Sequence, residues 1–287
     1  MTPKWPDALI DAVARRRAVI LIGSGISANA AADNGSRPPT WGQFLKKAYG
    51  DLGKSHKHIA AALKRFDYLE ACDYLKSEHG KEAWNQLIRT TFVTPGFRTA
   101  DIHKHIFNLD CRIVASLNFD KIYETYAIPA SENTLVIKNY YDADVRQAVA
   151  GTDRYLIKPH GTVDTMSKMI FTLEDYAKAR VEHAAFYEIM TALLHTHTFL
   201  CVGCGLSDPD MKLIFEDYRY KHSESPHYIV LPSPFAKQQA DLLQKTRGLN
   251  VIQYSPKADH AELTKELEQL GILASARREQ IAEFLSW

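Results

Sequence analysis

The sequence predicts an α/β fold: a doubly wound, mostly parallel Rossmann-like sheet with an inserted helical lobe. Short apolar runs recur along the chain, helix-like stretches separate most of them, and one interval between runs is much longer than the rest. Strands that are apolar throughout are typical of a parallel sheet with helices on both faces, because neither side of such a strand meets water. The expected strands are Ala18 to Ile22, Arg112 to Leu117, Thr134 to Ile137, Tyr155 to Ile157, Thr198 to Val202, Tyr228 to Leu231 and Asn250 to Gln253.

The long interval follows the first strand, where about 90 residues precede the second, several times the usual length of a crossover. Amphipathic helical patterns fill it, which predicts a helical lobe at about residues 40–110, and a smaller helical excursion is expected at about 173–197. No repeat or flexible linker divides the chain, so residues 1–287 are interpreted as a single domain. The helical patterns of the lobe are Trp41 to Tyr49, His58 to Leu63, Asp67 to Ser77 and Lys81 to Thr91.

Composition and charge narrow the class of protein. The chain has 35 lysines and arginines against 34 aspartates and glutamates, so its formal net charge of +1 attracts neither nucleic acid nor an anionic membrane. The segment Met1 to Asp11 lacks the features of a signal peptide, and no apolar run approaches the length of a membrane span. Four cysteines are too few for a disulfide framework and fit a reducing compartment. We therefore expect a cytoplasmic protein that binds neither nucleic acid nor membrane.

A glycine-rich turn directly after the first strand is the first candidate ligand site. Glycines let backbone N–H groups approach a phosphate, and with Ala28 the turn satisfies a relaxed dinucleotide fingerprint. An ordinary tight turn between strand and helix explains the same residues equally well. A classical dehydrogenase would have a second strand and an acidic ribose ligand about 20 residues further on, but the segment from Thr40 to Lys47 is helix-like. The turn consists of Gly23, Ser24, Gly25, Ile26 and Ser27.

Polar residues also follow three later strands, at the carboxyl ends where open α/β sheets bind ligands. Asn118 and Asp120 are candidates of this kind, although they also suit the start of a helix. His160 offers a group that titrates near neutral pH, although single histidines are often structural. A second glycine turn either caps the next helix at Ser207 or Asp208 or contacts a ribose or phosphate. Each structural explanation covers one segment, whereas a single nucleotide site explains all of them. The candidates are Asn118, Asp120, His160, Gly161, Gly203, Gly205, Ser207 and Asp208.

Taken together, these segments resemble the sirtuin-like superfamily, and specifically its bacterial antiphage-defence branch. The glycine turn, an S-x-N-x-D segment, an H-G pair and the second glycine turn occur in the family's order from about Val19 to Asp210, and the turn Pro39-Thr40-Trp41 is similar as well. The resemblance implies an NAD site in which the first glycine turn binds the pyrophosphate. It places Asn118 by the nicotinamide ribose, Asp120 near the carboxamide and His160 close to the ribose hydroxyls.

Two features of protein-deacylating sirtuins are missing, namely the two zinc-binding C-x-x-C pairs and a G-I-P-D-F-R-like stretch after the first turn. The only C-x-x-C here, Cys201 to Cys204, is expected to pack in the interior. The pair His103/His105 lies in a helical pattern, where residues at that spacing point to different faces, and His195/His197 has no evident carboxylate or cysteine partner. No metal is therefore expected. The resemblance then implies an NAD glycohydrolase that releases nicotinamide and ADP-ribose. In it Asn118 would orient water and ribose, and His160 would act as general base.

The function expected from this resemblance is the NAD-depleting effector of an antiphage, abortive-infection system. Because uncontrolled NAD cleavage would harm the host, activity is expected to be gated by a homo-oligomer, by a separately encoded defence-operon partner such as an ATPase or nucleotide-processing enzyme, or by both. Two alternatives stay open. One is a non-catalytic sensor that binds NAD or ADP-ribose, which the presence of both Asn118 and His160 disfavours. The other is an NAD-dependent protein deacylase.

Overall fold

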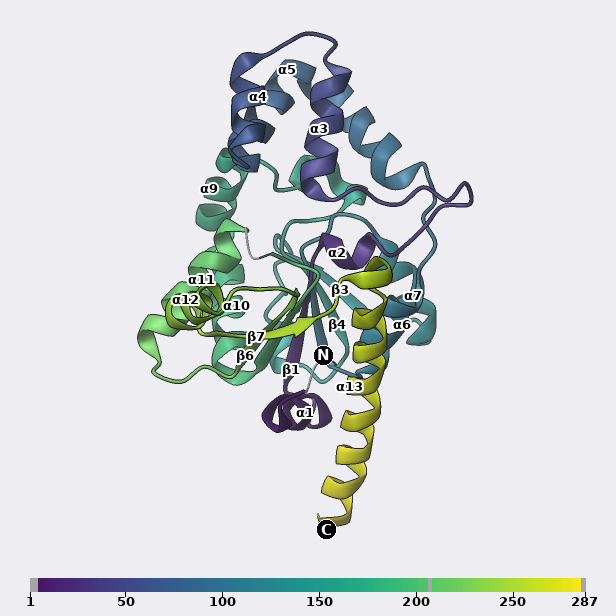
Figure 1. The fold of residues 1–287 in the computed structure, drawn as a ribbon, viewed down its shortest axis with the longest axis vertical. Coiled ribbons are helices and arrows are strands. Elements are labelled where there is room, and N and C mark those ends of the chain that lie inside the picture. The colour runs from purple at the N-terminus through teal and green to yellow at the C-terminus, as the bar shows by residue number, and fades with distance from the viewer. Residues whose placement is uncertain (1–4, 206–207, 285–287) are drawn as a thin grey trace.

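The computed structural model describes residues 5–205 and 208–284 (Figure 1). Its centre is a seven-stranded sheet in the order β3-β4-β2-β1-β5-β6-β7, and every neighbouring pair is parallel. The predicted α/β, Rossmann-like class is thus confirmed, with a sheet that is wholly parallel. The strands are β1 Ala18–Ile22, β2 Ile113–Ser116, β3 Val136–Asn139, β4 Tyr155–Lys158, β5 Thr198–Val202, β6 His227–Pro232 and β7 Leu249–Tyr254.

The central strand β1 shows why the sequence forms a doubly covered sheet. All of its residues are buried, and successive side chains point to opposite faces. Ile20 and Ile22 belong to one core. It is completed by helices α1 (Asp7–Ala14), α6 (Asp101–Asn108), α7 (Ile122–Ala130) and α13 (Lys257–Phe284). Val19 and Leu21 belong to a second core with helices α9 (Leu173–Glu182), α10 (Ala184–Thr196) and α11 (Pro209–Lys221). An alternating polar pattern would have left one of these faces without a partner.

The order of the strands decides where a ligand can bind. The strands that carry the candidate motifs, β4, β2, β1 and β5, are consecutive neighbours in the middle of the sheet. Because parallel strands end at the same edge, the residues that follow them lie close together there.

A helical lobe covers this carboxyl edge, at the top of Figure 1. It has an aromatic-rich core of its own, which includes Phe44 and Trp84. The long helix of the lobe is interrupted at Gly80, whose φ of 71° suits glycine, and the break falls between the two helical patterns of the sequence. Helix α6 (Asp101–Asn108) does not belong to the lobe, because it packs with α13 in the core that contains Ile20 and Ile22. The lobe comprises α3 Trp41–Asp51, α4 Lys57–Lys64, α5 Tyr68–Ile88 and the π-helical turn η1 Arg89–Val93.

Most of the remaining helices cover the two faces of the sheet, whereas α2 (Ser24–Ser27) and η2 (Val163–Lys168) lie at its carboxyl edge. Helices α1 and α13 pack together, and the Trp5 indole Nε1 donates to the Glu266 carbonyl oxygen at 3.0 Å. No helix in the described ranges has both the length and the apolar character needed to cross a membrane. The helices other than α6 that lie outside the lobe are α1 Asp7–Ala14, α2 Ser24–Ser27, α7 Ile122–Ala130, α8 Gln147–Ala150, η2 Val163–Lys168, α9 Leu173–Glu182, α10 Ala184–Thr196, α11 Pro209–Lys221, α12 Lys237–Arg247 and α13 Lys257–Phe284.

Candidate active site

A cavity of about 290 Å³ lies between the carboxyl edge of the sheet and the helical lobe. Most of the residues singled out in the sequence meet there, although they come from four different strands. Gly25, Gly161 and Gly203 do not line the cavity, and Ser207 lies outside the described residues. The predicted site residues that line it are Gly23, Ser24, Ser27, Asn118, Asp120, His160, Gly205 and Asp208.

The two glycine turns pack directly against each other. The Gly25 N–H donates to the Gly203 carbonyl oxygen at 2.9 Å, and the Gly23 N–H donates to the Val202 carbonyl oxygen at 3.1 Å. Gly203 has a φ of +64°, and a Cβ there would lie 2.7 Å from the Ile26 nitrogen. The glycines therefore allow the β1 and β5 turns to meet, and the N–H groups of Gly23 and Gly25 serve this contact. Among the first turn's residues, Ser24 and Ser27 bring polar side chains to the cavity.

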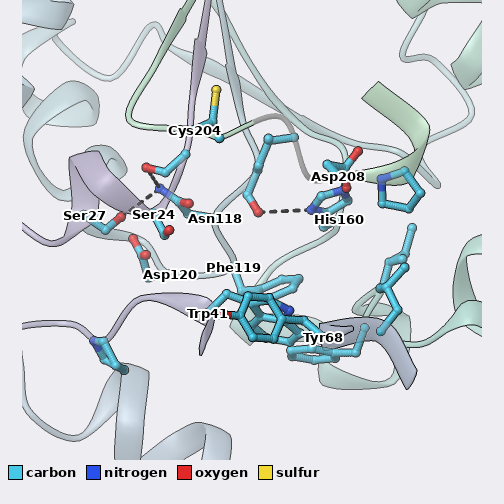
Figure 2. A pocket seen from close by; sticks show the side chains of 18 of the residues that line it. Ser24, Ser27, Trp41, Tyr68, Asn118, Phe119, Asp120, His160, Cys204 and Asp208 are labelled. Atoms are coloured by element: carbon cyan, nitrogen blue, oxygen red, sulfur yellow. Dashed lines mark hydrogen bonds and ion pairs between the residues drawn. The ribbon is translucent and has the colours of Figure 1, made fainter. Parts of the chain in front are cut away.

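Asn118 holds the first turn in place. Its Nδ2 donates to the Gly23 carbonyl oxygen at 3.0 Å and to Ser27 Oγ at 2.8 Å (Figure 2). Both amide hydrogens are thereby used, which fixes the orientation of the side chain and leaves Oδ1 as the acceptor available to a ligand. Asn118 does not cap the following helix. The N-cap position of α7 (Ile122–Ala130) is Lys121, and Asp120 Oδ1 accepts from the N–H of the first helical residue, Ile122, at 3.0 Å.

A buried ion pair lies beneath Asp120. The Lys158 side chain is fully buried, and its Nζ donates to the Asp120 carbonyl oxygen at 2.7 Å and to Glu124 Oε1 at 2.7 Å. Burial raises the pKa of Glu124, and the Lys158 charge opposes that rise. The pair fastens the segment after β2 to the end of β4. Neither residue was predicted as part of the site, although a lysine that ends an apolar strand is a visible signal in the sequence.

His160 is held at both ring nitrogens. Nδ1 lies 3.1 Å from the Leu117 carbonyl oxygen, and Nε2 lies 2.8 Å from Asp208 Oδ2. Burial by itself would lower the pKa of His160, but the Asp208 carboxylate and the carbonyl oxygen outweigh it, so the pKa is raised. The same pairing lowers the pKa of Asp208 despite its burial. Since both neighbours are acceptors, this geometry favours the imidazolium form.

Asp208 has two roles at once. Its Oδ1 accepts from the Met211 N–H at 2.8 Å and caps α11, with Pro209 as the first helical residue, as one interpretation of the sequence held. Its other oxygen, Oδ2, pairs with His160 and accepts from the Tyr176 hydroxyl at 2.6 Å. Because Asp208 is held at the start of α11, its carboxylate in turn holds the His160 ring in place. Tyr176 is a further site residue that the sequence analysis did not find.

Aromatic rings form the opposite wall of the cavity. Trp41 and Phe171 stack with their centroids 5.3 Å apart, and the Phe119 ring centroid lies 4.3 Å from that of Phe171. Figure 2 shows Trp41 and Phe119 across the cavity from Asn118 and His160. We call this set the aromatic wall, and the residues opposite it the polar wall. The aromatic wall comprises Trp41, Phe66, Tyr68, Phe92, Phe119 and Phe171, and the polar wall comprises Ser24, Ser27, Asn118, Asp120, His160 and Asp208.

The charges around the cavity are mostly negative. Asp67, Asp120 and Asp208 line it, and within the described ranges no lysine or arginine does. An anionic group bound here would depend on N–H and O–H dipoles, whereas a cationic ring would suit the carboxylates and aromatic faces. Of the pair Cys201 and Cys204, Cys204 lines the cavity, whereas Cys201 is buried and burial raises the pKa of its thiol well above the usual value.

Comparisons with known proteins agree with this architecture. Residues 112–252 match the SIR2-like domain. The NAD(+) hydrolase ThsA of Enterococcus faecium is 25% identical over 226 residues, which is 77% of this chain and 44% of that protein. ThsA of Bacillus cereus (strain MSX-D12) is 22% identical over 76% of this chain and 44% of its own. The Defense-associated sirtuin 2 of Bacillus subtilis is 22% identical over 85% of this chain and 24% of its own.

The fold, the order of the motifs and the matched domain point to one class: over residues 112–252 the chain is similar to SIR2-like domains. The relatives named above support, more specifically, the antiphage-defence branch of the sirtuin-like superfamily. The chain spans less than half the length of each of these relatives.

Proposed function

We propose that this chain is an NAD glycohydrolase that releases nicotinamide and ADP-ribose, and that it acts as the NAD-depleting effector of an antiphage system. The observation that carries the proposal is the convergence of Asn118, His160 and Asp208 opposite an aromatic wall. Two of the relatives are named as NAD(+) hydrolases, which supports the same reaction. The polar wall offers groups for ribose and water, and the aromatic wall offers faces for a flat ring.

The reaction needs a site that tolerates positive charge. Cleavage of the bond between nicotinamide and ribose creates an oxocarbenium-like centre at C1′ and expels a neutral base, and water then adds to C1′. In the proposed mechanism the free Oδ1 of Asn118 orients the ribose or the incoming water. Asp120, on the same wall, faces the positive charge of the nicotinamide ring.

His160 needs a change of partner before it can act as a base. In the resting geometry it is an imidazolium paired with Asp208, and an imidazolium cannot accept a proton. We propose that a ribose hydroxyl replaces Asp208 at Nε2 when substrate binds. Burial then becomes the dominant influence and lowers the pKa of His160, so the imidazolium releases its proton to solvent. The neutral imidazole takes the proton from water or from the ribose hydroxyl and later passes it to solvent.

The test is an incubation of the purified chain with NAD, in which nicotinamide is measured by chromatography. The proposal expects release without any acyl-peptide, and near-complete loss in the variants Asn118→Ala and His160→Ala. Full cleavage by both variants, with native circular dichroism spectra, would refute the assigned roles. Release only in the presence of an acyl-peptide would identify a deacylase, and NAD binding without release under all conditions would identify a sensor.

We also propose that activity is gated by self-assembly or by a defence-operon partner such as an ATPase or a nucleotide-processing enzyme. Light scattering combined with the NAD assay tests this idea, and candidate partners are added in separate reactions. A monodisperse monomer with full activity would contradict it.

A further inference from the structure

We propose that the helical lobe carries a binding site for a divalent transition metal such as Zn²⁺, formed by His56, His58 and Glu78. One ligand atom from each of these side chains lies within 4.8 Å of the other two. None of these three residues belongs to the polar wall or lines the cavity, so the proposed metal site is independent of the proposed NAD cleavage. It also departs from the sequence-based expectation that the protein binds no metal.

The backbone at the start of α4 brings the two histidines together. Two residues separated by one position inside a helix point to different faces. Here His56 is the N-cap and has an extended conformation, with φ −111° and ψ 99°, while His58 is already in the first turn of the helix. Their rings can therefore converge, and their centroids lie 5.8 Å apart at 90°.

Glu78 comes from the neighbouring helix α5 and completes the set. Its Oε2 lies 3.8 Å from His56 Nδ1, too far for a hydrogen bond and suited to an ion between the two atoms. Ligand atoms of a tetrahedral zinc are roughly 3.3 Å apart, given bonds of about 2.0–2.1 Å. The Glu78 side chain is 41% exposed and the His56 side chain 20% exposed, so small side-chain rotations can close the remaining distance.

The surroundings keep the ligands in place without competing for them. The Tyr74 ring lies edge-on to His58, with centroids 4.6 Å apart. The Tyr74 hydroxyl donates to Glu70 Oε1 at 3.1 Å, which fixes that ring. The neighbouring residue His79 points elsewhere, since its Nε2 lies 2.8 Å from the Ala48 carbonyl oxygen of α3.

The chemistry of the donor set favours a borderline transition metal over calcium or magnesium. Two imidazoles and one carboxylate are ligands that Zn²⁺ and its neighbours prefer, whereas the hard cations require oxygen. Three protein ligands leave one position for water or for a group from another molecule. Helices α4 and α5 are joined by a short turn at one end, and the proposed ion would join them at the other. We therefore infer that the ion stiffens the lobe.

The test uses tag-free full-length chain freed of metal with a chelator, and titration calorimetry with Zn²⁺. One ion per chain is expected to bind. Glu78→Gln and His58→Asn are expected to weaken binding at least about tenfold. Glu82→Gln, at an exposed position of α5 beyond the break at Gly80, is the matched control and is expected to bind as the wild type does. No binding by the wild type, or equal affinity in the wild type and both ligand variants, would overturn the proposal.

Two further readouts separate a metal site from a folding defect. Co²⁺ added to the wild type is expected to give visible absorption that Glu78→Gln lacks. Zn²⁺ is expected to raise the Tm of the wild type and of Glu82→Gln, but not of Glu78→Gln, because an ion that binds only the folded state stabilises it. An equal rise in Glu78→Gln would show that the ion binds elsewhere and would contradict the proposal.

Discussion

The two walls of the cavity are fixed by different physical means. Hydrogen bonds position the polar wall: Asn118 is tied to the first glycine turn, and His160 is tied to Leu117 and Asp208. The aromatic wall is positioned by the packing of lobe rings against rings from the segments after β2 and η2, as the stacking of Trp41 on Phe171 illustrates. The polar wall therefore tolerates few changes of atom type, whereas the aromatic wall depends on volume and shape. Substitutions in the first should change the chemistry, and substitutions in the second should change substrate affinity.

The largest effect is expected for Asn118→Ala. The variant loses the oriented amide beside the reacting ribose, and we expect nicotinamide release to fall by about 10²–10³-fold. The matched control is Asn29→Ala, because Asn29 Nδ2 also bonds to the first turn, at Gly25 and Ile26, but does not line the cavity. The control should retain most of its activity. Equal losses in both variants would mean that Asn118 acts only through the turn.

The next effect concerns the contact between the glycine turns. In Gly203→Ala, the new Cβ lies against the Ile26 nitrogen and the backbone keeps a positive φ. We expect the free energy of unfolding to fall by about 1–3 kcal/mol, measured by urea titration. Gly205→Ala should stay close to the wild type, because a Cβ there meets no atom of the described residues within 4 Å. If both variants were equally stable, the turns would not need the close contact described above.

The Asp208–His160 pair predicts a dependence on pH. Asp208→Asn keeps the helix cap but removes the charge, so burial should lower the pKa of His160, and the acidic limb of kcat/KM should move to lower pH. The control is Asp241→Asn, which removes an exposed carboxylate from α12 and should leave the limb where it is in the wild type. An unchanged limb in Asp208→Asn would argue against His160 as the base.

The same pair predicts how stability varies with pH. The pKa of His160 is raised, so its contribution is complete below about pH 6.5 and is lost as the pH rises through the folded-state value. The pKa of Asp208 is lowered, so its contribution is complete above about pH 4 and is lost as the pH falls through its folded-state value. The difference in Tm between wild type and Asp208→Asn should therefore be largest between about pH 4 and 6.5. A difference that grows above that range would contradict the pairing.

The smallest effect is expected at the edge of the aromatic wall. Phe66 is 72% exposed, lines the cavity and has a φ of 60°, which is costly for a phenylalanine. Phe66→Gly should raise KM for NAD a few-fold with little change in kcat, and should keep or raise the Tm, because glycine adopts this φ freely. Tyr220→Ala, at another exposed aromatic, should leave KM unchanged. A fall in kcat in Phe66→Gly would place this ring nearer the chemistry.

The polar wall was largely predictable because its residues directly follow apolar strands. Once β4, β2, β1 and β5 are neighbours, Asn118, His160 and Asp208 must lie at one edge of the sheet. The hydrogen-bond partners of these residues were harder to predict from the sequence. A hydrogen bond from Asn118 to Ser27, or the pairing of His160 with Asp208, depends on side-chain geometry that sequence spacing does not specify. The hydrogen bond from the Gly25 N–H to the Gly203 carbonyl oxygen is a further contact that sequence spacing does not specify.

The aromatic wall was hardly predictable, because its rings come from segments far apart in the chain. Trp41 starts a lobe helix, Phe119 follows β2, and Phe171 follows η2. In the sequence they are ordinary apolar residues, and only the packing of the lobe onto the sheet brings them together. The proposed metal site was unpredictable for the same reason, because Glu78 lies on a different helix from His58 and only the fold brings the two side chains together.

The excess of carboxylates around the cavity has a consequence for turnover. NAD brings a positively charged ring to Asp120 and its neighbours, whereas ADP-ribose keeps the negative pyrophosphate and lacks that ring. If the chain cleaves NAD as proposed, the loss of the ring removes the main attraction and leaves repulsion from Asp67 and Asp120. We therefore expect weak product inhibition, so that the rate of NAD loss would stay high while ADP-ribose accumulates.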